Sequence, residues 1–193
     1  MDDTFTAIPE RVFQFIDLKK KLKLDFLWRC ESRVDVVTEE MVKRLAESNC
    51  VGVAFGVESG SQEVLDKIHK GINLMHVEYV VDLMHNYDIY VSLNFMLGHY
   101  CDTVESLDMT YQFIKKMYDK YRVGIFATFN TPFPGTWQRM HMDKIGIKLL
   151  LTDYSQYSVL SPSIEGENFT VEDQLEVYQK ILPIMYDNDF GLR

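Results

Sequence analysis

One junction constrains the fold of this chain more than any other feature. A dense apolar run, VGVAFGV at residues 51–57, stops abruptly at Glu58-Ser59-Gly60-Ser61, and a helical pattern begins directly afterwards. A short apolar run bounded by polar turn residues is typical of a buried strand. Buried strands of α/β proteins carry their ligands at their carboxyl ends, so this junction predicts a binding site.

Predicted strands and helices alternate through most of the chain. Strands are expected at residues 24–30, 51–57, 88–98 and 122–130. Helices are expected at residues 8–23, 38–49, 62–70, 74–87 and 103–120. This alternation predicts right-handed βαβ units around a parallel sheet, that is, an α/β fold.

The pattern changes near Pro132. The segment TPFPGTW is typical of a turn that leads into a short helix, the residues after it are mostly irregular, and a last helix begins at Thr170. We therefore expect residues 1–146 to form the sheet-containing unit. Residues 147–193 are expected to form a helical extension that packs against this unit.

The amino terminus does not fit the alternation. The segment MDDTFT places acidic, hydroxyl and aromatic residues before a helix, as a loop after a strand would, yet no strand precedes it. A parallel sheet that begins in the middle of a unit leaves an unpaired edge, which proteins normally cover. We expect that amino-terminal βα units are missing from this chain.

Composition argues against several classes of partner and site. The formal net charge of -9 argues against a general nucleic-acid-binding or membrane-binding surface. The three cysteines, Cys30, Cys50 and Cys101, are too far apart in sequence for a CxxC-type metal site. An odd cysteine count without a signal sequence favours a reducing, cytoplasmic location. No apolar run approaches the ~18 residues that span a bilayer.

Polar side chains lie in or directly after the predicted strands. Glu31 and Arg33 follow the first strand, Glu58 and Ser59 follow the second, and Asn94 lies inside the third. Because parallel strands end at the same rim of a sheet, these groups should converge there. A mixture of carboxylates, an amide and an arginine indicates a polar or zwitterionic small molecule.

Simpler interpretations of the same residues are also open. Glu31 and Arg33 could form a surface ion pair of little energetic value, and residues 58–61 could merely cap the next helix. Glu58 and Glu31 could also act as an acid/base pair in an unrelated (β/α) enzyme. Asn94 is harder to explain structurally, because a buried amide needs hydrogen-bond partners.

Four segments together carry a family resemblance. In order, they are DDTFT, WRCESRVDVVTEEMVKRLAESNCVGVAFGVESGSQEVLDKIHKGIN, FMLGHYCDTVES and TPFPGTW. In this order and spacing, the chain resembles the radical S-adenosylmethionine superfamily, and in particular the branch whose members often carry a cobalamin-binding domain. The match covers nearly the whole chain, and FGVESGSQEVLDKIHKG is its most specific piece.

The resemblance implies a partial (β/α) barrel, similar to a TIM barrel, with parallel strands. In the family, a CxxxCxxC loop after the first strand binds a [4Fe-4S] cluster, which cleaves S-adenosylmethionine to a 5′-deoxyadenosyl radical. Later strand ends hold the cofactor and cover the radical. By position, the residues expected to contact the ribose, the methionine group or the substrate are Asp2, Asp3, Glu31, Arg33, Glu58, Ser59, Lys70 and Asn94.

Two departures from the family pattern change what is expected of this chain. No CxxxCxxC occurs anywhere in the sequence, so no residue is expected to ligate a cluster or another metal. The segment GHYCDT also stands where family members usually have a glycine- and proline-containing loop. The shape of that loop therefore has to come from the structure.

We therefore expect part of a radical S-adenosylmethionine enzyme core, for methyl transfer or a related modification, that is inactive as this chain alone. Its partners would be S-adenosylmethionine, an unknown substrate and a missing amino-terminal barrel or cobalamin-binding portion, with cobalamin as a further candidate cofactor. The alternative is a non-catalytic remnant, a binding module or a subunit of a split barrel. No catalytic residue is assigned, and the candidates for substrate contact are Trp28, Asn130, Phe133 and Tyr154.

Overall fold

A parallel sheet forms the centre of the structure, a computed structural model that describes residues 4–151 and 153–187. Its strands lie in the order β1 (Trp28–Ser32), β2 (Cys50–Glu58), β3 (Tyr90–Leu97) and β4 (Gly124–Phe129). All neighbouring pairs are parallel. The predicted α/β fold with a parallel sheet is confirmed.

Helices connect and cover these strands. They are α1 (Pro9–Lys21), α2 (Glu39–Glu47), α3 (Gln62–Lys67), α4 (Leu74–Asn86), α5 (Val104–Tyr121), α6 (Trp137–Met140) and α7 (Val171–Tyr186). Capping side chains set several of their starts: Thr38 accepts a hydrogen bond from the Met41 backbone, and Thr103 forms a reciprocal capping box with Ser106. Within the described residues, none of the helices has the length and apolar character needed to cross a membrane.

The first strand begins later than the expected range of residues 24–30. The residues that cap the end of α1 extend to Leu24. The Leu24 backbone N–H donates to the Lys19 carbonyl at 3.0 Å, and Lys23 has a φ of 53°. This is the hydrogen-bond pattern that closes many helix ends. β1 consequently starts at Trp28, where the strand first pairs with β2.

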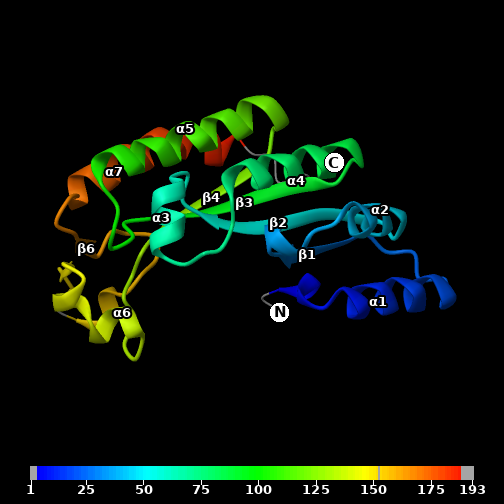
Figure 1. Ribbon diagram of the computed structural model, residues 1–193, viewed down its shortest axis with the longest axis horizontal. Coiled ribbons are helices and arrows are strands. Elements are labelled where there is room, and N and C mark those ends of the chain that lie inside the picture. Colours follow the sequence, from blue (N-terminus) through cyan, green and yellow to red (C-terminus); the bar gives the residue numbers. More distant parts are fainter. Residues whose placement is uncertain (1–3, 152, 188–193) are drawn as a thin grey trace.

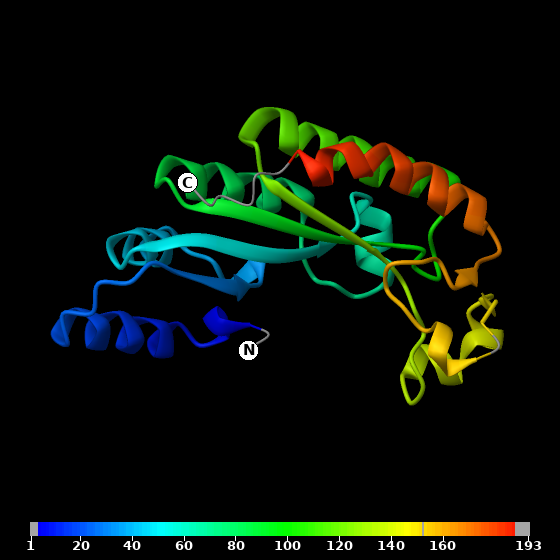
Figure 2. The ribbon, with the colours of Figure 1, turned by 180° about the vertical axis from the view of Figure 1, so that it is seen from behind.

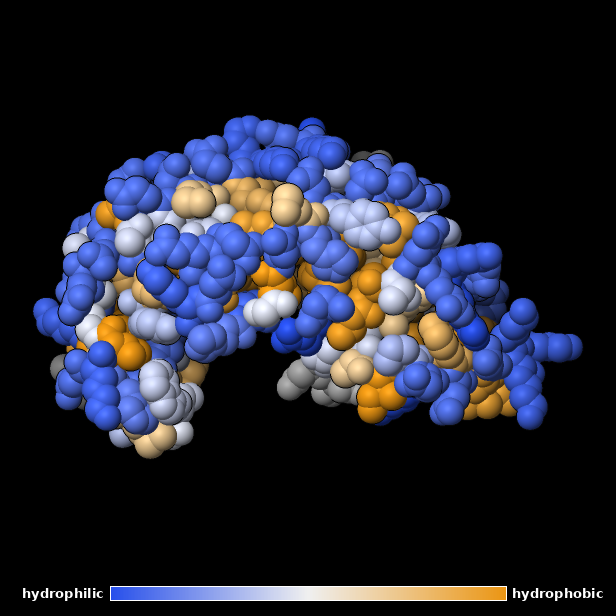
Figure 3. Space-filling model, viewed as in Figure 1, coloured by the Kyte–Doolittle hydropathy of each residue, from blue (hydrophilic) through white to orange (hydrophobic). Residues whose placement is uncertain are grey.

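The sheet curves into an arch with α4, α5 and α7 over its outer face (Figure 1). α2 packs on β2, α4 packs on β3, and α7 packs on both β4 and α5. Seen from behind, α1 and α6 lie at opposite ends of the arch (Figure 2). The space-filling view shows the hollow between these ends, on the concave side of the sheet (Figure 3). This is the shape of a partial (β/α) barrel.

The two faces of the sheet differ in burial. On β3, Val91, Leu93, Phe95 and Leu97 are buried beneath the helices, whereas Asn94 belongs to the half-buried concave face. Such alternation is expected of a strand that is packed on one face only. The concave face is therefore the one that is free to hold a ligand.

β2 looks uniformly apolar in sequence for a different reason. Its concave-face residues are Gly52, Ala54 and Gly56, so the strand carries no polar side chain before Glu58. Because these side chains are small, they leave space above the strand on the concave side of the sheet. The apolar run therefore marks a packed face together with an open face built from small side chains.

The residues after β4 carry short elements and a last helix. β5 (Lys148–Leu149) and β6 (Ile164–Glu165) pair antiparallel, and α7 returns to pack on the sheet. A small second core of Met142, Ile147 and Ile164 joins this part together. The boundary between residues 146 and 147 stays a prediction.

Candidate functional site

A cavity of about 220 Å³ opens at the carboxyl ends of β1, β2 and β3. Its lining consists of Glu31, Arg33, Glu58, Lys70 and Asn94, together with Thr4, Ser32, Ala54 and Gly56. Five of the residues predicted to contact a cofactor therefore meet in one place, although the contact itself stays a prediction. Asp2 and Asp3 lie outside the described residues.

An ion pair between Lys70 and Glu58 lies in this cavity. The Lys70 Nζ atom is 2.7 Å from Glu58 Oε1, and the two side chains are only 18% and 25% exposed. Gly56 makes room for the pair, because a Cβ added there would lie 2.7 Å from Glu58 Oε1 and 3.2 Å from Lys70 Nζ. A cation and a carboxylate held together in a half-buried cavity suit a zwitterionic ligand.

The backbone of Glu58 is held in an uncommon conformation. Its φ is 75°, in the left-handed region that residues with a Cβ rarely adopt. The pairing of β2 with β3 also shifts register between Gly56 and Glu58, which is a β-bulge. Such conformations cost about 1–3 kcal/mol and cluster at functional sites. The strand end is therefore shaped for more than sheet pairing.

Arg33 organises the side of the cavity. Its guanidinium binds Asp35 through two hydrogen bonds of 2.9 Å, and its Nη2 atom also donates to the Lys70 carbonyl at 3.2 Å. The Arg33 guanidinium lowers the pKa of Asp35. Arg33 therefore forms its ion pair with Asp35 and not with Glu31, and Glu31 lines the cavity.

Ser59 does not line the cavity with its neighbour Glu58. Its side chain is buried, its Oγ atom lies 3.2 Å from Thr110 Oγ1 on α5, and it accepts a hydrogen bond from the Ser61 backbone. Gly60 N–H donates to the same Thr110 oxygen at 3.0 Å. Ser61 caps α3. Residues 59–61 therefore dock the turn onto α5, and the capping interpretation is correct for Ser61.

The loop GHYCDT after β3 is held by a buried carboxylate. Asp102 Oδ2 accepts hydrogen bonds from the backbone N–H groups of Gly98 at 3.1 Å and His99 at 2.8 Å, and Oδ1 accepts from Ser106 Oγ at 2.6 Å. Burial raises the pKa of Asp102, an effect opposed by these hydrogen bonds and by His99. The acidic residue of the loop thus fixes its shape, although the residues around it depart from the family pattern.

Two further cavities lie near the first. One, of about 390 Å³, is lined by residues of the loop after β3 and of α6, among them His99, Trp137 and Gln138. Neither His99 nor Gln138 is among the site residues expected from the sequence. Neither residue belongs to a recognisable motif, so only the pairing of distant segments reveals them.

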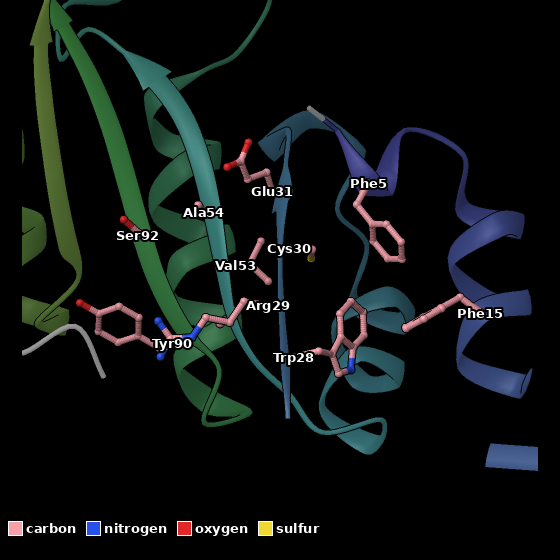
Figure 4. Close-up of a pocket in the computed structure, with 11 residues that line it drawn as sticks. Phe5, Phe15, Trp28, Arg29, Cys30, Glu31, Val53, Ala54, Tyr90 and Ser92 are labelled. Carbon is pink, nitrogen blue, oxygen red and sulfur yellow. The ribbon is translucent and has the colours of Figure 1, made fainter. Parts of the chain in front are cut away.

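The other cavity, of about 540 Å³, lies along β1 and shares Glu31 and Ala54 with the first. Figure 4 shows Phe5, Phe15 and Trp28 grouped on one side of β1. Trp28 packs edge-on against both phenylalanines and donates from Nε1 to the Ser48 carbonyl. These contacts give Trp28 a packing role in addition to its place in the cavity wall.

The residues of this chain do not fit an iron–sulfur cluster. Within the described part, no group of three or more His, Cys, Asp or Glu side chains could hold a metal ion. Cys30 and Cys50 lie on neighbouring strands, and Cys101 lies on the loop after β3. A cluster with one open iron needs three thiolates at close spacing, so its ligands would have to come from elsewhere.

Comparison with known proteins decides the family. Residues 1–114, more than half of the chain, match the family model described as "Radical SAM superfamily". This chain belongs to the radical SAM superfamily. The parallel partial barrel and the strand-end cavity agree with that assignment.

Relatives of this radical SAM protein include methyltransferases. It is 32% identical over 184 residues to an uncharacterized methyltransferase of Pyrococcus horikoshii, covering 93% of this chain and 38% of that protein. It is 27% identical over 188 residues to a bacteriochlorophyllide d C-12(1)-methyltransferase of Chlorobaculum tepidum, covering 96% of this chain and 40% of that protein. The chain thus spans about two fifths of the length of these relatives.

A solved structure shares the fold. The radical S-adenosylmethionine methyltransferase TsrM from Kitasatospora setae, determined with cobalamin and a [4Fe-4S] cluster bound, superimposes with a TM-score of 0.63 at 19% identity. The superposition covers 84% of this chain and 34% of TsrM. At this level of identity the likeness concerns the fold alone.

Proposed function

We propose that this chain forms the S-adenosylmethionine-binding part of a radical SAM enzyme that transfers a methyl group or makes a related modification at an unactivated carbon. The observation that carries the proposal is the cavity at the strand ends, where the Lys70–Glu58 pair meets Arg33, Glu31 and Asn94. The methyltransferase names of the relatives support the reaction class.

The charges of the cavity match those of the proposed ligand. Lys70 and Arg33 would bind the methionine carboxylate, because cations form strong hydrogen bonds to carboxylates. Glu58 would bind the methionine ammonium, and Glu31 and Asn94 would accept and donate hydrogen bonds to the ribose hydroxyls. Bound S-adenosylmethionine supplies a transferable methyl group and a sulfonium that one electron can cleave.

The chain's own residues would orient this molecule and keep water from one side of it. Gly56 and Ala54 provide a floor on which a ligand can approach the sheet backbone. The bulge at Glu58 and the hydrogen bond from Arg33 to the Lys70 carbonyl hold the charged side chains in position before binding. No step is assigned to an iron–sulfur cluster, since the residues present do not fit one.

The proposed partner is the polypeptide portion that carries the cluster loop, with or without a cobalamin-binding domain. Among the described residues β1 pairs only with β2, so its other edge is open to a further strand. The alternative function is a non-catalytic remnant or a subunit of a split barrel. An adjacent reading frame encoding a CxxxCxxC strand would favour a split enzyme, and its absence would favour a remnant.

The test of cofactor binding uses the cluster-containing enzyme of which this chain forms part. Lys70→Met and Glu58→Gln each keep the side-chain size and remove one charge, so we expect S-adenosylmethionine affinity to fall by about tenfold or more, or about 1.4 kcal/mol. Lys180→Met is the matched control, because Lys180 forms an ion pair of similar length with Glu176, which is exposed on α7. Unchanged affinity in both cavity variants would overturn the proposal.

A second experiment addresses the chain alone. Anaerobic iron–sulfur reconstitution of the 193-residue chain, followed by iron analysis and titration with S-adenosylmethionine, should yield no stoichiometric cluster. A stoichiometric cluster that cleaves the cofactor would show that the cysteines of this chain suffice.

A further inference from the structure

The cavity of about 390 Å³ is built mainly from polar side chains. It lies between the end of α3, the loops after β3 and β4, and α6, which stands at one end of the arch (Figures 1 and 2). Small-molecule sites usually enclose about 300–1,000 Å³, so its volume suits such a ligand. The polar lining residues are Lys67, His69, His99, Tyr100, Asn130 and Gln138.

Two buried polar atoms of this lining have no hydrogen-bond partner among the described residues. They are His99 Nε2 and Gln138 Nε2. Buried polar side-chain atoms are nearly always satisfied, so two unpartnered atoms in the lining of one cavity need an explanation. The kind of group that satisfies them follows from what each atom can donate or accept.

His99 presents a hydrogen-bond acceptor. Its side chain is buried, and burial lowers the pKa of His99, opposed by the carboxylates of Asp102 and Glu58, so the imidazole is neutral at neutral pH. A neutral imidazole carries one N–H, and the ring uses it to donate to the Glu58 backbone carbonyl. Because Nε2 is the unpartnered nitrogen, Nδ1 carries the proton and Nε2 holds a free lone pair.

Gln138 Nε2, in contrast, can only donate. A carboxylate has no proton for His99, and an ammonium group has no lone pair for Gln138. A hydroxyl group both donates and accepts through one oxygen atom, so hydroxyl groups satisfy both residues. A single water molecule does so too, but it takes up only about 30 Å³ and leaves most of the cavity unfilled.

The rest of the polar lining favours several hydroxyl groups over a charged one. Tyr100 OH donates to the Lys67 carbonyl at 2.7 Å, which leaves its oxygen able to accept. The ammonium group of Lys67 is offset by Glu63 at 2.7 Å. Asn130, which is 6% exposed, donates to the Gly98 carbonyl at 3.0 Å. These groups offer neutral donors and acceptors on more than one wall.

Trp137 adds a ring surface to this polar lining. It is 59% exposed and stacks on His141 with a centroid distance of 4.5 Å and an angle of 19°, which fixes the orientation of its ring. The face of an aromatic ring is electron-rich and attracts C–H groups. A sugar ring combines such a C–H face with hydroxyl groups around its edge.

We infer that this cavity binds a polyhydroxylated group, such as a sugar ring, on the substrate of the proposed enzyme. One hydroxyl donates to His99 Nε2, a hydroxyl oxygen accepts from Gln138 Nε2, and the C–H face of the ring lies against Trp137. The inference rests on the proposed function, because it places the substrate beside the cofactor. The His99 ring is bonded to the backbone of Glu58, whose side chain lines the cofactor cavity.

The test is saturation-transfer NMR of the 193-residue chain with the methyl glycosides of glucose, galactose and mannose. These probes differ only in configuration at single carbon atoms, and we expect at least one to bind with a millimolar Kd. Each hydroxyl of that probe is then replaced in turn by fluorine, which keeps the size and removes the proton. At one position or more the affinity should fall by about tenfold, because His99 Nε2 loses its donor.

Variants of the lining assign this binding to the cavity. Gln138→Leu removes the buried donor and should weaken glycoside binding by about tenfold. Gln112→Leu is the matched control, because Gln112 is exposed on α5 and donates to Asp108 on the same helix. His99→Phe, with its fold checked by circular dichroism, should abolish the difference between the glycoside and its weakest fluorinated analogue.

Several results would overturn the inference. If no glycoside binds at millimolar concentration, ordered water alone satisfies the two atoms. Equal affinities for all fluorinated analogues, or equal losses in Gln112→Leu and Gln138→Leu, would show that the two residues do not bind hydroxyl groups. Tighter binding of acetamide than of any glycoside would assign the cavity to an amide. Displacement of the glycoside by adenosine would assign it to the cofactor.

The two proposals fail separately. If Lys70→Met and Glu58→Gln leave S-adenosylmethionine affinity unchanged, the proposed function fails, while glycoside binding still describes a site for hydroxyl groups. If cofactor affinity falls as expected but no glycoside binds, only the substrate inference fails.

Discussion

The ion pair between Lys70 and Glu58 joins the loop after α3 to the end of β2, the strand that precedes this helix, and it lies next to Gly56. The hydrogen bond from Arg33 to the Lys70 carbonyl adds a third segment to the same place. Two neighbouring strands and the loop after α3 thus supply the charges of one cavity.

Gly56→Ala should lower S-adenosylmethionine affinity by about tenfold in the cluster-containing enzyme, or about 1.4 kcal/mol. The new Cβ would lie 2.7 Å from Glu58 Oε1, so the ion pair has to move. Gly52→Ala is the matched control on the same strand, because the atoms nearest to its Cβ would belong to the flexible Arg29 side chain, at 3.3 Å. Equal effects of the two substitutions would contradict the role given to Gly56.

Gly60→Ala should destabilise the fold, measured by urea unfolding, by about 1–3 kcal/mol. A Cβ at this position would lie 2.6 Å from Thr110 Cα and 2.8 Å from the Met109 carbonyl oxygen, and backbone atoms cannot turn aside as a side chain can. Thr110→Val, which keeps the shape but removes the hydroxyl bonded to Ser59 and Gly60, should cost about 1 kcal/mol. A stable Gly60→Ala chain would show that the turn does not dock on α5 in this way.

Cys101 should react slowly with iodoacetamide at pH 8. Burial, together with the nearby Asp102 carboxylate, raises the pKa of Cys101 from 9.0 to about 11. Because the thiolate is the reactive form, a rise of two pKa units lowers the rate by about 100-fold relative to an unperturbed thiol. The rate should climb as the pH rises toward 11, which peptide mapping by mass spectrometry can follow. A plateau reached near pH 9 would contradict the burial seen here.

The isolated chain should self-associate in light scattering. β1 has an open edge among the described residues, and Leu24, Phe26 and Leu27 beside it are 46%, 43% and 70% exposed. Leu27→Lys places a charge at this edge and should lower the associated fraction. Leu160→Lys is the control, since Leu160 is 61% exposed and lies in the segment that follows Val159, whose carbonyl bonds to β4 at the opposite side of the sheet from β1. A monomeric unaltered chain would argue against β1 as a pairing surface.

Local patterns in the sequence determined the helices and strands of this protein and the edge of the sheet at which a ligand is expected to bind. Alternating runs predicted the parallel sheet, Thr38 and Thr170 marked helix starts that the structure confirms, and the polar residues after each strand pointed to the rim. These features depend on residues a few positions apart, so one segment contains all the information that they need. The family resemblance, now shown, rests on the same short segments.

Tertiary structure alone decided which of those polar residues share a cavity. Ser59 stands next to Glu58 in sequence, yet one side chain packs on Thr110 and the other pairs with Lys70. His99 and Gln138 line one cavity only because the loop after β3 and α6 pack beside each other. The direction of a side chain at a bulge, and the partner that it finds on a distant segment, depend on how whole elements pack, which no local pattern records.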